Sequence, residues 1–133
     1  MDLRILEIAS NTENNKILDK HTHKSKNKNP MCGDEMEISL LIKDNKVIDM
    51  GYQCKSCIYC QASVSLLSQN IKDKNLEEIK DLINTCEKLF ENTKIILEKK
   101  WINFKEIFNK NNISRKECLL LPMRTVLKAL KIQ

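Results

Sequence analysis

Six cysteines are the residues of this 133-residue chain that point most directly to chemistry: Cys32, Cys54, Cys57, Cys60, Cys86 and Cys118. The apolar runs reach only about five residues, too short for a membrane span or for the core of an export signal. We therefore expect a soluble, cytoplasmic protein. In that reducing compartment, clustered cysteines typically bind metal or carry out sulfur chemistry rather than form disulfides.

Three of the cysteines form a C-x-x-C-x-x-C run, Cys54, Cys57 and Cys60. Thiols so close together can hold zinc or iron. The alternative for Cys54 and Cys60 is that they are small buried hydrophobes, and the spacing leaves both readings open. Cys57 differs because a predicted strand ends and a predicted helix begins there. The positive end of a helix dipole favours a nucleophilic thiolate, so we expect Cys57 to be functional.

Two further cysteines also stand at the ends of predicted elements. Cys32 lies in the segment N-P-M-C-G-D, which ends at Asp34, and Cys118 lies just before the last helix, three residues after Arg115. With Cys57, these residues could meet at one end of a small domain. Three thiolates and one carboxylate would make a tetrahedral zinc site, or a cluster site with one weak and replaceable ligand. The alternative role for Asp34 is that of a turn cap.

The spacing of apolar residues predicts the elements that must position these groups. Residues 1–10 favour a short amphipathic helix, and residues 11–30 a polar loop with room for one short strand. From Met36 the period changes to two, with Ile48, Met50 and Tyr52 on the buried face of the second strand. Asp44-Asn45 provides the turn of this β-hairpin.

The second half of the chain has helical spacing. One stripe runs through Cys57, Cys60, Val64, Leu67 and Ile71. Asn75 is the expected N-cap of a second helix that ends near residue 84. Residues 86–110 predict one long or two short helices with an aromatic core around Trp101, and residues 111–116 a connector. Pro122 fits the first turn of the last helix.

Together these elements predict one α+β domain over residues 1–133, with a small antiparallel sheet and helices packed on one face. The net charge is +5, and the stretch 16–28 carries five lysines against one aspartate. We interpret this stretch as a solvated, flexible basic loop rather than a nucleic-acid patch. Only three of the 23 basic residues are arginine, and basic and aromatic residues do not alternate, which argues against nucleic-acid binding.

At N-P-x-C-G-D, at G-Y-Q-C-K-S-C-I-Y-C-Q-A-S and at R-K-E-C-L-L-L-P, the chain resembles the NifU/IscU/SufU family of iron–sulfur cluster scaffolds. The resemblance extends over essentially the whole chain. The long gap between Cys57 and Cys118 is similar to that of the SufU branch, which carries an insertion, here within residues 86–110. The histidine that precedes the third cysteine in IscU-like proteins is Glu117 here, which also favours the SufU branch.

The resemblance implies an α+β fold with an exposed ligand site made by Cys32, Asp34, Cys57 and Cys118. It implies a scaffold rather than an enzyme: a protein that accepts sulfur from a cysteine desulfurase, binds iron or a [2Fe–2S] cluster, and passes the cluster to apo iron–sulfur proteins. Cys118 is the expected sulfur acceptor, with the nearby cation Arg115 stabilising its thiolate. Cys54 is not a standard ligand of the family, and the role of Cys60 stays open.

Two other functions fit the same residues. The first is a zinc-binding sulfurtransferase, in which zinc holds the thiolates until the desulfurase docks and one cysteine then attacks the persulfide sulfur. The second, more remote, is a zinc-stabilised nucleic-acid-binding module. We also predict that Cys86 is a buried structural thiol, and that His21 and His23 are solvated rather than ligands.

Overall fold

The structure, a computed structural model, describes residues 3–30, 32–92 and 94–131. Its elements follow in this order: α1 (Leu3–Ala9), β1 (His23–Lys28), β2 (Glu35–Lys43), β3 (Lys46–Lys55), α2 (Ile58–Asn70), α3 (Leu76–Leu89), the 3-10 helices η1 (Lys99–Glu106) and η2 (Lys110–Arg115), and α4 (Lys116–Lys131).

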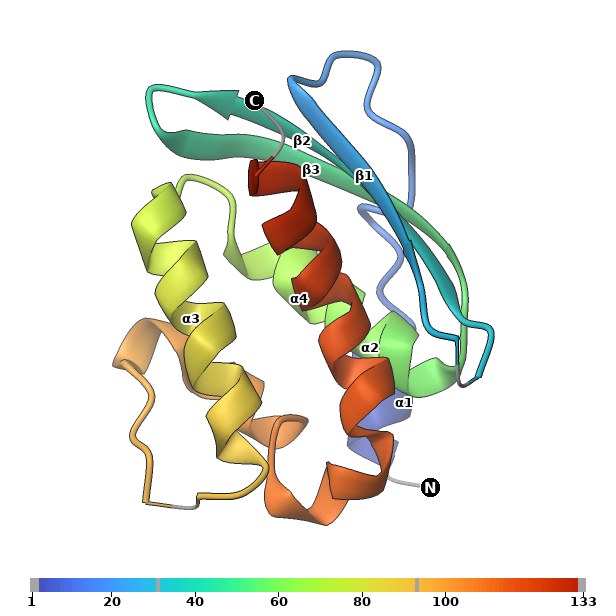
Figure 1. Cartoon of the computed structure of the whole chain (residues 1–133), viewed down its shortest axis with the longest axis vertical. Helices are drawn as coiled ribbons and strands as arrows, with labels where there is room; N and C mark the ends of the chain where they lie inside the picture. The colour runs from blue at the N-terminus through green and yellow to red at the C-terminus, as the bar shows by residue number, and fades with distance from the viewer. Residues whose placement is uncertain (1–2, 31, 93, 132–133) are drawn as a thin grey trace.

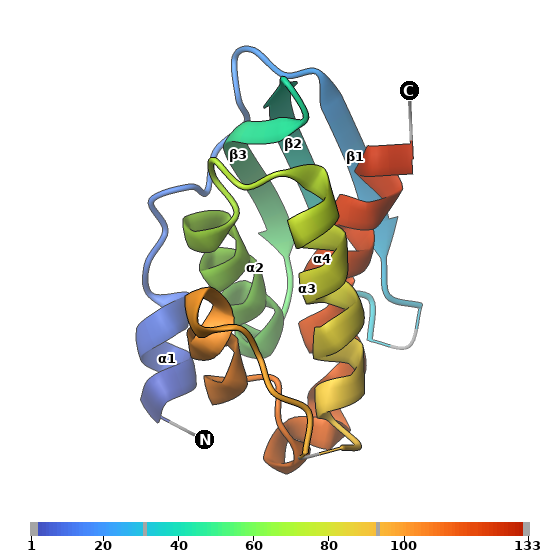
Figure 2. The same ribbon diagram turned by 90° about the vertical axis from the view of Figure 1, so that its left-hand side faces the viewer.

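The three strands form one antiparallel sheet in the order β1-β2-β3 (Figure 1). Helices α2 and α4 pack against one face of this sheet, and α3 lies beyond them (Figure 2). Ile38 stands opposite Tyr52 and Leu40 opposite Met50, and all four side chains are buried beneath the helices. The predicted α+β architecture with helices on one face is therefore confirmed.

The hairpin of β2 and β3 turns where the sequence predicts. Asp44 and Asn45 have φ of 53° and 63°, the left-handed conformation that both residues tolerate and that a two-residue hairpin turn requires. One detail of the prediction is wrong, because Ile48 is exposed and Val47 is buried instead. The pairing shifts next to the turn, so that Leu41 faces Asp49 and Ile42 faces Val47. Ile48 is the extra residue of a β-bulge, which reverses the alternation from there to the turn.

The basic stretch is more ordered than the predicted loop. Residues 23–28 form the edge strand β1, and Lys24 and Lys26 each pair with Glu37 on β2 at 3.1 Å. These two lysines lower the pKa of Glu37. Part of the excess positive charge is thus neutralised within the sheet, which further weakens the case for a nucleic-acid patch.

The segment before β1 lies against the sheet. The Tyr52 N–H donates to the Asn14 carbonyl at 3.1 Å, and the Leu18 N–H donates to Ser39 Oγ at 3.3 Å. A Cβ on Gly51 would lie 2.4 Å from the Lys16 carbonyl oxygen, so this close approach requires glycine. Much of the predicted flexible loop is therefore packed rather than free.

The helices differ in how they are covered. Helix α2 is buried on nearly every side, since it lies between α1, α4 and the sheet. Helix α3 begins at the predicted N-cap, where Asn75 and Glu78 form a capping box, and it continues to Leu89, past the predicted end.

Helix α4 begins at Lys116, earlier than predicted. Pro122 is its seventh residue and not part of its first turn, so that prediction is wrong. Proline has no N–H, and the carbonyl of Cys118 therefore lacks its usual donor four residues later. Ser63 Oγ on α2 donates to the next carbonyl, that of Leu119, at 2.6 Å and ties the start of α4 to α2.

The region 86–110 is an apolar cluster held by irregular backbone rather than by the predicted α-helices. After α3 ends, η1 is its one regular element within the described residues. Its rings are buried and touch at their edges: Phe90 and Phe108 lie 5.8 Å apart, and Trp101 and Phe104 6.0 Å apart. The predicted aromatic core around Trp101 is confirmed. Over residues 3–30, 32–92 and 94–131, no helix is long and apolar enough to cross a membrane.

Candidate metal-binding site

The site is built where three elements meet at one end of the sheet: the loop from β1 to β2, the start of α2 and the first turn of α4. In Figure 1 this loop lies at the lower right, next to the point where β3 leads into α2. The Asn29 N–H donates to the Asp34 carbonyl, and the Gly33 N–H donates to the Asn29 carbonyl, both at 2.8 Å. Gly33 has φ of 77°, which glycine adopts without strain. The backbone thus closes the loop behind Cys32.

Cys32, Asp34 and Cys118 offer ligand atoms that all lie within 4.8 Å of one another. Zinc–sulfur bonds of about 2.3 Å would place tetrahedral ligands roughly 3.8 Å apart, so a small contraction would close the group around one cation. Cys32 is exposed, whereas Asp34 and Cys118 are buried. Cys57 is outside this group, but its N–H donates to Asp34 Oδ1 at 3.2 Å, and its side chain contributes to the raised pKa of Cys118. All four residues predicted as ligands therefore meet at this end of the sheet.

Asp34 divides its two carboxylate oxygens between two roles. Oδ1 accepts a hydrogen bond from the Cys57 N–H at 3.2 Å. Oδ2 is buried and has no hydrogen-bond partner among the described residues. A buried carboxylate oxygen without a partner is costly, and a cation beside it would remove that cost. The bond to Cys57 joins the loop to the start of α2, so it is not the local turn cap of the alternative, and it leaves Oδ2 for the ligand role. The sequence carried no signal for the bond to the Cys57 backbone.

Cys118 lies in the first turn of α4 and is only 8% exposed. The prediction that it lies just before the last helix is wrong, because α4 begins two residues earlier. Burial raises the pKa of Cys118 to about 12, with further contributions from the nearby side chains of Cys57, Cys32 and Asp34. Without a cation, this thiol holds its proton.

Arg115 does not take the expected position beside the Cys118 thiolate. Its guanidinium is exposed and lies over the ring of Tyr59, 5.0 Å from the centroid. Lys116 pairs with Glu91 at 3.5 Å. Because the pKa of Cys118 is raised and none of the contributions comes from these cations, a thiolate stabilised by Arg115 is not what the site contains. The contact with Tyr59 had no signal in the sequence.

The remaining cysteines fall into two environments. Cys60 is fully buried in α2 beside Val64, as the helical stripe predicted, and Cys54 is half-buried at the end of β3. Burial raises the pKa of both thiols, and the nearby charges of Asp34 and Cys57 add to the shift. Ser56 lies between them in sequence, and its buried Oγ has no hydrogen-bond partner in the described part of the chain.

Cys86 is fully buried on α3, and burial alone raises its pKa, which confirms the predicted structural thiol. His21 is exposed and His23 is partly exposed on the edge strand, where His23 Nδ1 lies 2.8 Å from Thr22 Oγ1. Neither histidine is part of the ligand group.

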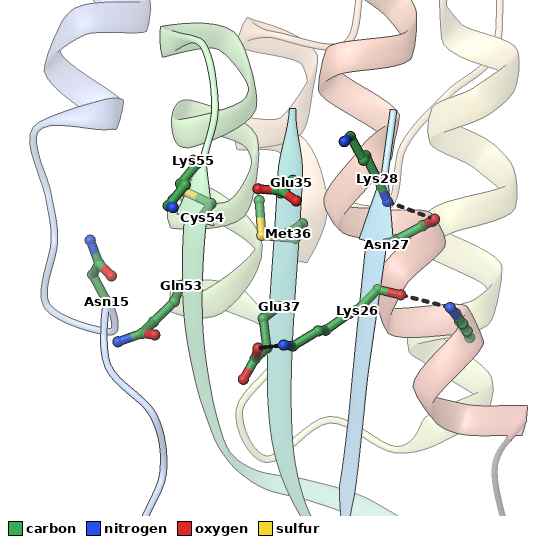
Figure 3. Close-up of a pocket in the computed structure, with 11 residues that line it drawn as sticks. Asn15, Lys26, Asn27, Lys28, Glu35, Met36, Glu37, Gln53, Cys54 and Lys55 are labelled. Carbon is green, nitrogen blue, oxygen red and sulfur yellow. Dashed lines mark hydrogen bonds and ion pairs between the residues drawn. The ribbon is translucent and has the colours of Figure 1, made fainter. Parts of the chain in front are cut away.

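A cavity of about 730 Å³ lies next to the site and not within it (Figure 3). Its walls are polar side chains of the sheet, among them Lys26, Glu37, Gln53 and Lys55, and of the cysteines it includes only Cys54. The ligand group therefore lies outside this cavity.

Comparisons with known proteins agree with this geometry. A family model for the NifU-like N-terminal domain matches residues 2–101. The iron–sulfur cluster assembly scaffold protein IscU of Thermotoga maritima is 33% identical over 132 residues, which are 96% of this chain and 89% of that protein. The chain belongs to the NifU-like N-terminal domain family. The family model ends before Cys118, whereas the match to the Thermotoga protein extends over nearly the whole chain.

Two solved structures share the fold of this NifU-like chain. The putative iron–sulfur cluster assembly scaffold protein for the SUF system from Fervidobacterium islandicum has a TM-score of 0.89 at 23% identity, covering 98% of this chain and 96% of that one. The N-terminal part of a NifU-like protein from Brucella abortus has a TM-score of 0.87 at 21% identity, covering 98% and 91%. These likenesses establish the α+β fold of the family for this chain.

Proposed function

We propose that this chain, an iron–sulfur cluster assembly scaffold of the IscU and SufU type, builds its cluster on Cys32, Asp34, Cys57 and Cys118. The observation that carries the proposal is the pairing of a buried, unpartnered carboxylate oxygen with thiols at short range. This arrangement is a set of donors suited to a cation. The cluster is cargo, assembled there and then passed on.

The donors suit a cargo that must be both held and released. Thiolate sulfur binds iron firmly, and a carboxylate oxygen binds it less firmly. Asp34 then provides the position at which a recipient's ligand enters. Each thiol must lose its proton as iron binds, and the bound cation supplies the positive charge that Cys118 lacks in the metal-free site. The Cys57 N–H keeps Asp34 in place during both states.

The sulfur and the destination of the cluster imply protein partners. We expect a cysteine desulfurase to deliver persulfide sulfur to Cys118, and apo iron–sulfur proteins to receive the cluster, in the cytoplasm. Because Cys118 is buried and protonated in the metal-free chain, transfer to it requires a bound cation or a rearrangement at the start of α4. Locating the persulfide by mass spectrometry after reaction with the desulfurase tests this assignment.

Metal analysis tests the proposal itself. Protein purified without oxygen and reconstituted with Fe²⁺ and sulfide should bind a [2Fe–2S] cluster, seen in its visible absorption, and the cluster should be lost in Cys32→Ala, Cys57→Ala and Cys118→Ala. Cys86→Ala is the matched control. A chain that holds zinc tightly and never forms a cluster would instead be a zinc-binding sulfurtransferase.

A further inference from the structure

Two thiols of the C-x-x-C-x-x-C run, Cys54 and Cys60, have no part in the proposed ligand set, and Cys60 shares the first turn of α2 with the ligand Cys57. Cys57 is the N-cap of α2, and Cys60 is the third residue of that helix. The Gln61 N–H donates to the Cys57 carbonyl at 3.0 Å, which closes the first turn around both residues. Helix geometry places Cα atoms three residues apart at about 5 Å, within the range of roughly 4.4–6.8 Å that a disulfide spans.

The two thiols differ in access. Cys57 is only half-buried, so an incoming group can reach its sulfur. Cys60 is fully buried behind it. Dithiols that undergo exchange are built in this way, with an accessible thiol that reacts first and a sheltered thiol that resolves the product.

We propose that Cys60 is the resolving thiol of this pair, and that it reduces a persulfide carried on Cys57 and releases the sulfur as sulfide. The inference rests on the proposed function, because a scaffold receives sulfur as persulfide. Sulfur that arrives on Cys118 can pass to Cys57, since both residues lie beside Asp34: the Cys57 N–H donates to Asp34 Oδ1 at 3.2 Å, and the Cys118 sulfur lies within 4.8 Å of an Asp34 oxygen.

The step balances within the chain. The Cys60 sulfur attacks the inner sulfur of the Cys57 persulfide, and the bond from that inner sulfur to the terminal sulfur breaks. The terminal sulfur leaves with the electron pair and with the Cys60 proton as hydrogen sulfide. The persulfide sulfur is thereby reduced from the zero-valent state to sulfide, and the two thiols become a disulfide. A dithiol reductant then restores the pair.

This chemistry answers a requirement of the cluster. A desulfurase supplies zero-valent sulfur, whereas a [2Fe–2S] cluster contains sulfide, so two electrons must enter between the two. Cys60 would provide them at the site. The disulfide also removes Cys57 from the ligand set, so a cluster would form only after the pair is reduced again.

The test uses the full chain, without oxygen, with glutathione persulfide as the sulfur source and no desulfurase. In the unmodified protein, peptide mapping should find a disulfide between Cys57 and Cys60, with one sulfide released for each disulfide. Cys60→Ala should keep the persulfide on Cys57 and release sulfide at least tenfold more slowly, and added dithiothreitol should restore release. Cys54→Ala is the matched control and should behave as the unmodified protein does.

Equal sulfide release from Cys60→Ala, or a disulfide that joins Cys54 to Cys57, would overturn the inference. Mapping the disulfide in the unmodified protein decides the question even if Cys60→Ala fails to fold. The outcomes also separate the two proposals. If the chain forms the disulfide with glutathione persulfide but accepts no sulfur from a desulfurase, the role of Cys60 is supported and the proposed desulfurase partner is wrong. If the chain assembles clusters without forming this disulfide, the scaffold function is supported and the role of Cys60 is wrong.

Discussion

Cys86 and Cys118 are both buried thiols, on helices that pack against each other, yet their surroundings are opposite. Cys86 on α3 is enclosed by apolar groups, and burial alone raises its pKa. Cys118 on α4 has Cys57, Cys32 and Asp34 around it, and each of these adds to the effect of burial. The surroundings of Cys86 need no further partner. The surroundings of Cys118 contain donor groups that repel one another once they ionise.

This difference separates the parts of the domain that carry stability from those that carry chemistry. The aromatic cluster beside α3 buries large rings, and neither of the unpartnered buried side-chain atoms found among the described residues belongs to it. The thiol end leaves a carboxylate oxygen without a partner in the described residues. Changes in the first region should alter unfolding and not metal binding, and changes in the second should do the opposite.

The largest effect is expected in the aromatic cluster. Phe104→Ala removes a fully buried ring that contacts Trp101 and Phe108, and it should lower the free energy of unfolding by about 3–5 kcal/mol. Denaturant titration measures this loss. Zinc affinity, measured at a temperature where the variant is folded, should stay unchanged, and a large loss of affinity would mean that the two regions are not independent.

Cys118→Ala should lower zinc affinity on the order of a hundredfold or more. Loss of a residue that only orients a metal ligand already lowers affinity by about 10–100-fold, and loss of the ligand itself should cost at least as much. Competition with a chelator measures the affinity. Cys86→Ala removes an equally buried thiol from the other region and should leave it unchanged. If both variants bind zinc as the parent does, the candidate site is misplaced.

Zinc affinity should also rise with pH. The raised pKa of Cys118 means that the metal-free site holds its proton near pH 8, and binding the metal releases it. A site that releases one thiol proton gains about tenfold in affinity for each pH unit. Calorimetry in buffers of different ionisation enthalpy counts the protons, and Cys118→Ala should release one fewer. Equal proton release from the variant and the parent would show that Cys118 is not a ligand.

The smallest effects concern Asp34. Asp34→Ala removes the acceptor for the Cys57 N–H and should cost about 0.5–2 kcal/mol in unfolding free energy. Asp34→Asn keeps an acceptor and should restore most of that stability. Both variants should slow cluster release, since the carboxylate ligand is gone in each. Lowered stability with unchanged release would leave Asp34 as a turn cap only.

How much could be predicted from the sequence depends on how local each cause is. The turn at Asp44-Asn45 and the cap at Asn75 depend on neighbouring residues, and both were predicted. The sequence of β1 has no apolar alternation that would predict a strand. Its pairing with β2 decides its conformation. The bulge at Ile48 and the early start of α4 also depend on packing between distant elements.

For the site, the motifs and the resemblance indicated all four proposed ligands, but not their environment. Burial of Cys118 follows from how α4 packs on α2 and the sheet. The stacking of Arg115 on Tyr59 joins two elements that are distant in sequence. The spacing of residues in the sequence does not predict either contact.

Cluster transfer from the reconstituted chain to an apo-ferredoxin tests the central claim most directly. The cluster, assembled with Fe²⁺, L-cysteine and a cysteine desulfurase, should appear in the ferredoxin spectrum and leave this chain in equal amount. Cys86→Ala should transfer at the parent rate, and Cys118→Ala should have no cluster to give. Transfer from Cys118→Ala at the parent rate, or zinc binding with no cluster formed, would contradict the account.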